Sequence, residues 1–135
     1  MAYNSYLIKI NSATELPMTY MQAQTYVVTP EQRLEISAER DVTGVLHRNT
    51  AAHTPTKIEF KTPYLTNTQL ASLVSLLTNG YTNALEKKIP LQYYNPITDS
   101  YLTGNFYVPD IALTIHKIDS TTIIYEPVRI AFIEY

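Results

Sequence analysis

One stretch of this chain has the signals of an α-helix, and the segments on both sides of it have the signals of strands. Thr66 and Gln69 have the Thr-x-x-Gln spacing of a capping box, and Asn79-Gly80 is typical of a left-handed helix stop. Between them, apolar residues recur at the i, i+3, i+4, i+7 spacing of a single stripe: Leu70, Leu73, Val74 and Leu77. The sequence therefore predicts one helix, over residues 67–79, in a chain made otherwise of strands.

Two segments, residues 33–40 and 56–62, alternate between apolar and polar residues with the period of a half-buried strand. The residues expected to face inward are Leu34, Ile36 and Ala38 in the first segment and Ile58 and Phe60 in the second. Further extended segments are expected at residues 6–10, 23–29, 89–94, 101–108, 111–118 and 121–135. The last of these contains Pro127, which requires a bulge or an edge position because proline cannot donate to a strand ladder.

The composition supports a β-rich chain: 12 Tyr and 8 Pro occur beside only 3 Gly. Tyrosine suits a half-buried pleated surface, and proline interrupts it at turns. We therefore predict a mainly β (α+β) fold, an antiparallel β-sandwich or split barrel of about eight strands, with the helix packed across it. A chain of 135 residues is expected to form one structural domain, residues 1–135.

Charge and cysteine content exclude several classes of protein. The formal net charge is −2, so a general nucleic-acid binder is disfavoured, and the chain has no cysteine for disulfides or thiolate zinc sites. We see no signal peptide and no apolar run near the ~20 residues of a membrane span. The expectation is a soluble protein made in the cytoplasm, with no membrane insertion and no readout of nucleic-acid sequence.

Residues that could carry chemistry are few and scattered. His47 and His53 fall in a polar loop and His116 on a strand, while Asp99 and Asp110 fall at turns, where aspartate bonds to its own backbone. The sequence contains no nucleophile elbow, phosphate-binding glycine loop or zinc-protease motif. We therefore predict no enzymatic activity and no catalytic, cofactor-binding or metal-binding residues.

Four tyrosines cluster on the hairpin predicted from residues 89–94 and 101–108, and they form a candidate aromatic surface: Tyr93, Tyr94, Tyr101 and Tyr107. Such rings could stack on sugars, or they could contact protein, because tyrosine offers a large area with few rotatable bonds. They could also simply pack across the hairpin. The sequence does not choose between these interpretations.

The segment 41–55 shows neither helical nor sustained strand periodicity, yet it is not simply polar, because it contains apolar residues that favour burial. We predict that it is an arm or hairpin that contacts adjacent subunits and becomes ordered on assembly. An ordinary intramolecular hairpin is the alternative. The candidate inter-subunit contacts are Val42, Val45, Leu46 and Arg48.

Short motifs along nearly the whole chain resemble a family of small tail proteins of tailed bacteriophages and prophages of Gram-positive bacteria. The motifs are the strand Leu7–Asn11, the turn Arg40–Gly44, the helix start Leu65–Leu70, the strand Gly104–Val108 and the alternating strand Arg129–Glu134. The segment 41–55 looks longer than the resemblance leads us to expect. The resemblance implies a tail-tube or baseplate-hub fold, a ring-forming β-sandwich with one helix.

Two functions are therefore expected from the sequence. The first is a non-enzymatic virion structural protein of a distal tail, tube or baseplate, made in the host cytoplasm. Its implied partners are copies of itself in a ring and other phage tail proteins, without a cofactor. The alternative is a carbohydrate-binding β-sandwich that recognises a host-surface glycan.

Overall fold

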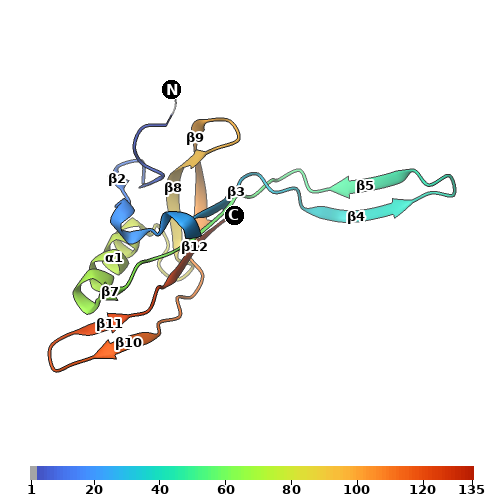
Figure 1. Cartoon of the computed structure of the whole chain (residues 1–135). Coiled ribbons are helices and arrows are strands. Elements are labelled where there is room, and N and C mark those ends of the chain that lie inside the picture. Colours follow the sequence, from blue (N-terminus) through green and yellow to red (C-terminus); the bar gives the residue numbers. More distant parts are fainter. Residues whose placement is uncertain (1–2) are drawn as a thin grey trace.

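The computed structural model describes residues 3–135, and in this range the chain is mainly β, with one α-helix and three antiparallel sheets (Figure 1). The strands are β1 (Ile8–Ile10), β2 (Thr14–Glu15), β3 (Val27–Thr29), β4 (Glu35–Arg40), β5 (Leu46–Thr50), β6 (Lys57–Lys61), β7 (Leu65–Thr66), β8 (Lys88–Asn95), β9 (Ser100–Tyr107), β10 (Ile115–Ile118), β11 (Ile123–Tyr125) and β12 (Arg129–Glu134). The helix is α1 (Asn67–Gly80), and the 3-10 turns are η1 (Met18–Tyr20) and η2 (Ala23–Thr25). The prediction of a mainly β fold with one helix is confirmed. The structure has more strands than the eight or so that the sequence predicts, because several short strands are added.

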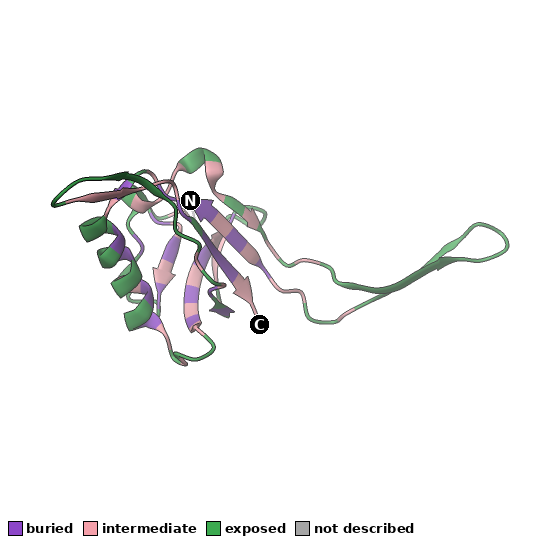
Figure 2. Ribbon diagram, turned by 90° about the horizontal axis from the view of Figure 1, so that it is seen from below, coloured by how far each residue is buried: buried purple, intermediate pink, exposed green. Residues whose placement is uncertain are grey.

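The body of the molecule is a seven-stranded sheet with the order β2-β1-β8-β9-β12-β6-β3. Helix α1 lies against one side of this sheet, and its buried residues face the sheet (Figure 2). A three-stranded sheet, β10-β11-β7, lies beside the helix, and a two-stranded sheet, β4-β5, extends away from the body. The largest fully buried core side chains include Phe60, Phe106, Phe132, Ile8, Ile58 and Leu73.

The helix begins and packs as the sequence predicts. Thr66 and Gln69 form the capping box, since each side chain accepts from the other residue's backbone N–H. Leu70, Leu73 and Leu77 are buried. Val74 was expected in the same stripe but is 41% exposed, because it lies at the edge of a buried face narrower than predicted.

The end of the helix corrects the sequence prediction. Gly80 was expected to stop the helix in a left-handed conformation, but in residues 3–135 Gly44 is the only glycine with a positive φ. A Cβ at residue 80 would instead lie 2.4 Å from Ile10 Cγ2 and 2.8 Å from Ile89 Cδ1. Glycine is therefore required because the helix approaches two buried strand residues closely.

Replacing Gly80 by alanine should destabilise the protein by about 1–3 kcal/mol, because the added methyl group overpacks the contact with Ile10 and Ile89. Helix propensity alone would give the opposite sign, a gain of about 1 kcal/mol. Urea denaturation measures the change, and Asn79→Ala, on the exposed side of the same turn, is the control. A Gly80→Ala variant as stable as the parent would contradict this reading of the contact.

Segment 56–62 forms β6 as predicted, with Ile58 and Phe60 buried. Segment 33–40 forms β4, but the predicted inward face is wrong: Leu34 and Ile36 are 46% and 66% exposed, and Ala38 is exposed too. The reason is that β4 pairs only with β5 and extends away from the core, so neither of its faces is covered. A register shift between Glu35 and Ser37 also interrupts the alternation.

The C-terminal part of the chain is divided more finely than expected. The single strand predicted over residues 121–135 is two strands, β11 and β12, in different sheets, with Pro127 in the break between them. Residues 23–29 are a strand only from Val27 onward, after the turn η2, and residues 111–118 only from Ile115 onward. The predicted hairpin is confirmed as β8 and β9, which pair from Lys88↔Tyr107 to Asn95↔Ser100.

Candidate functional site

The most distinctive surface is the extension formed by residues 32–55, here called the arm (Figures 1 and 2). It contains β4 and β5, paired antiparallel from Glu35↔Thr50 to Arg40↔Leu46, and all residues of both strands are exposed. The large apolar side chains that the arm exposes are Leu34, Ile36, Val42, Val45 and Leu46. Apolar side chains on an extension without a covering layer favour a surface that contacts another protein.

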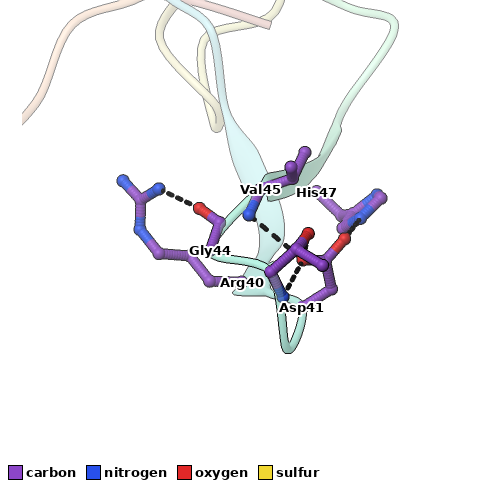
Figure 3. A network of polar contacts seen from close by, with 6 residues as sticks. Arg40, Asp41, Gly44, Val45 and His47 are labelled. Atoms are coloured by element: carbon purple, nitrogen blue, oxygen red, sulfur yellow. Dashed lines mark hydrogen bonds and ion pairs between the residues drawn. The ribbon is translucent and has the colours of Figure 1, made fainter.

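The tip of the arm is held by one carboxylate (Figure 3). Asp41 Oδ1 accepts from the backbone N–H of Thr43 at 2.9 Å, from its hydroxyl at 2.6 Å and from the backbone N–H of Val45 at 3.1 Å. Asp41 Oδ2 lies 2.9 Å from His47 Nε2, and Arg40 donates to the Gly44 carbonyl at 2.8 Å. Gly44 has a φ of +85°, which glycine adopts without strain.

These contacts lower the pKa of the Asp41 carboxyl well below its usual range, with the Thr43 hydroxyl as the largest cause, followed by His47. A carboxyl with a lowered pKa in the folded state stabilises that state above its ordinary pKa of 3.8. The contribution declines as the pH falls below that value. The tip is therefore a preformed turn at neutral pH.

The predicted inter-subunit contacts all lie on the arm. Val42 and Val45 are at the tip, 105% and 55% exposed, and Leu46 begins β5 at 42% exposure. Arg48 Nε donates to Glu35 Oε1 at 2.6 Å across the two strands. The sequence confines the arm to residues 41–55, whereas in the structure the arm also includes β4, which the sequence predicts as a strand with a buried face, and segment 41–55 contains the strand β5.

The four predicted tyrosines do not form one aromatic surface. Tyr93 is 2% exposed and its hydroxyl lies 2.9 Å from Thr56 Oγ1, because the strand alternation turns it away from Tyr94 and into the core. Tyr94 and Tyr101 are cross-strand partners with ring centroids 5.6 Å apart. Tyr107 lies at the other end of β9.

Tyr101 is also covered. The Tyr6 ring stacks on it at 4.5 Å, and the Tyr101 hydroxyl donates to the Tyr6 carbonyl at 2.6 Å. The Tyr94 hydroxyl donates to Asp99 at 2.6 Å. The contacts between Tyr6 and Tyr101 attach the N-terminal segment to the β8–β9 hairpin, and both Tyr94 and Tyr101 are half-buried, so the glycan-binding alternative gains no open platform from this pair.

The three histidines, which are the residues most suited to chemistry, lie apart. His47 contacts Asp41, His53 bonds the Tyr135 carbonyl, and His116 Nδ1 lies 3.0 Å from Glu126 Oε1. Within residues 3–135, no group of three metal-ligating side chains comes together. The same range holds no helix with the length and apolar character of a membrane span.

Comparison with known proteins adds a family and a fold. A family model described as "Family of unknown function (DUF6711)" matches residues 1–135. Among curated proteins there is no match. A solved structure, "Tail of empty GTA particle computed with helical refinement, C6 symmetry", contains a chain that superposes with a TM-score of 0.55 at 13% identity. The match covers 99% of this chain and 95% of that one, so the two share a fold over their whole length.

Proposed function

The chain belongs to the DUF6711 family of unknown function, and we propose that it is a non-enzymatic structural protein of a phage-like tail. The observation that carries this proposal is the fold shared with a GTA particle tail chain, since the match covers nearly all of both chains. A fold alone does not define a function. The arm supplies the second support, because it is a surface suited to contact and contributes nothing to the core of its own chain.

The finer proposal is that copies of this chain form a ring and that the arm of one copy contacts the next. A two-stranded hairpin is marginally stable in water by itself, and a third strand or a packed face makes it stable. The arm has neither within its own chain, although it exposes Val42, Val45 and Leu46. A head-to-tail contact between identical subunits closes into a ring when the rotation closes. The neighbouring structure was refined with C6 symmetry.

In this proposal the protein resides in the virion tail, as a distal tail, tube or baseplate component, after synthesis in the cytoplasm of a bacterial host. Its partners are copies of itself and other tail proteins. The resemblance to tail proteins of phages and prophages of Gram-positive bacteria supports this position and this type of host.

Hydrogen exchange on the isolated chain and on the assembled protein tests the arm directly. In the isolated chain we expect weak protection at the amides of Val45 and Leu46, because the arm has no covering layer and brief local openings expose these amides even though the closed hairpin predominates. In the assembly we expect slow exchange at the same amides, while Ile58 and Phe60 in β6 are protected in both. Full protection of Val45 and Leu46 already in the isolated chain would contradict the arm contact.

A further inference from the structure

The two chain segments of the arm meet the body at one buried residue. Thr56 is fully buried, and its Oγ1 accepts from the backbone N–H of Glu31 at 3.0 Å. Next to it, the Gln32 N–H donates to the Pro55 carbonyl at 2.9 Å. Thr56 belongs to the returning segment and Glu31 to the outgoing one, so this hydroxyl joins the two where the arm begins.

The same threonine is bonded to two strands of the body. Its hydroxyl lies 2.9 Å from the Tyr93 hydroxyl on β8, and its N–H donates to Glu134 Oε1 on β12 at 2.8 Å. The Glu134 N–H donates to the Thr56 carbonyl at 3.0 Å. A hydroxyl offers one donor and two acceptor positions, so the Thr56 side chain can hold both Glu31 and Tyr93 at once.

The neighbouring strand leaves room for this arrangement. A Cβ on Gly104 of β9 would lie 2.5 Å from Glu134 Oε2, so the missing side chain makes space for the carboxylate. Tyr93 is fixed in turn by an edge-to-face contact with Phe106, with ring centroids 5.5 Å apart. The partners of Thr56 are therefore themselves held by the core.

We propose that Thr56 is a positioning residue that sets the direction in which the arm leaves the body. The buried Thr56 hydroxyl bonds to the outgoing segment at Glu31 and to β8 at Tyr93. These two bonds should resist bending where the arm joins the body. The extended chain rises about 3.3 Å per residue, so a small tilt at the root is amplified over an arm of roughly 30 Å. The role of the arm in assembly rests on the proposed function. The anchoring of the arm by Thr56 does not depend on that function.

Distance measurement between two spin labels tests the anchoring in the isolated chain. Because the sequence has no cysteine, two introduced cysteines are the only labelled positions. Val42→Cys at the exposed tip and Ser75→Cys on the exposed side of α1 report the arm against the body. We expect a narrow distance distribution in this background, and one at least about twofold wider with Thr56→Val, which leaves the Glu31 N–H without its acceptor. Thr56→Ser, which keeps the hydroxyl, should restore the narrow distribution.

Thr62→Val is the matched control. Thr62 is also fully buried, and its Oγ1 accepts from the Val128 N–H at 3.0 Å, so this change removes an equivalent hydrogen bond away from the arm. It should lower the melting temperature as Thr56→Val does, yet leave the distance distribution narrow. If Thr56→Val does not fold, Tyr93→Phe replaces it in the test. This change removes the hydrogen bond between the Thr56 hydroxyl and β8, so it should also widen the distance distribution.

Three results would overturn the proposal. The first is a wide distance distribution in the doubly labelled protein without a further substitution. The second is an unchanged width in Thr56→Val, or in Tyr93→Phe if Thr56→Val does not fold. The third is a widening in Thr62→Val equal to that in Thr56→Val. A chain that fails to assemble would contradict the proposed function instead, and it would leave the distances measured in the isolated chain unaffected. The two failures are therefore distinguishable.

Discussion

Leu73→Ala is expected to lower the free energy of unfolding by about 2–5 kcal/mol, the usual cost of emptying a packed leucine site. Leu73 is fully buried in the cluster where α1 meets the seven-stranded sheet. Leu73 shares its core cluster with buried residues of β1, β8 and β9, strands that are hydrogen-bonded to one another, so we expect the site to have little freedom to collapse. A domain of this size has only ~5–15 kcal/mol of stability, so a large shift of the urea midpoint should follow.

The same helix supplies the controls. Val74 is the next residue along the chain but is 41% exposed, so Val74→Ala should change the stability by well under the Leu73 effect. Ser75→Ala and Ser72→Ala, on the exposed side, should do little, although Ser72 Oγ donates to the Thr68 carbonyl at 3.1 Å. Equal, small changes at residues 72, 73 and 75 would mean that the helix does not pack as described.

The parts of the fold that could be predicted from sequence are those in which burial repeats with the period of the element. Helix α1 combines a cap with a periodic stripe, and β6 alternates strictly between Ile58, Phe60 and charged neighbours. The β8–β9 hairpin has a turn-rich loop between two apolar runs. In each of these the side chains alone indicate which face meets the core.

The parts that sequence misread depend on contacts between distant residues. The pattern of residues 33–40 predicts a strand correctly, but nothing in it shows that both faces are left uncovered. Strand β5 shows no alternation of apolar and polar residues, because neither of its faces is buried against a core. Gly80 resembles a helix stop until Ile10 and Ile89 are seen to lie against it.

Part of the candidate site can likewise be predicted from the sequence, and part cannot. The apolar residues of segment 41–55 were recognised because a polar loop rarely carries them, and the structure places them on one extension. Thr56 was not recognised, because a threonine at the start of a strand is ordinary in sequence. Its importance comes from Glu31 and Tyr93, which lie 25 and 37 residues away along the chain.

The arm suits a contact that forms after folding. Part of its charge has a partner within the arm itself: Arg48 pairs with Glu35, His47 lies against Asp41, and Arg40 donates to the Gly44 carbonyl, so these groups would keep a polar partner if a contact excluded water. What remains for a neighbour is the apolar tip and the open edges of the two strands. In the proposed ring, the tip should therefore contribute much to assembly and little to the stability of its own chain.

Assembly should be lost when the tip is made charged. In the double variant Val42→Lys/Val45→Lys, two lysines would have to be buried without partners in the contact, so we expect self-association at least about a hundredfold weaker. The isolated variant should unfold within about 0.5 kcal/mol of the parent, because both side chains are exposed. Sedimentation velocity over a range of concentrations measures the association, and urea denaturation measures the stability.

Leu85→Lys/Ile97→Lys is the matched control, since these apolar side chains are 99% and 76% exposed and the change in net charge is the same. They lie on two loops of the body rather than on the arm. If repulsion between more positively charged chains were the cause, both double variants would lose assembly equally, and the specific role of the tip would be refuted. Parent protein that stays monomeric at every concentration would refute self-assembly itself. Loss of association in the tip variant alone, with its stability unchanged, is the result that a ring built through the arm requires.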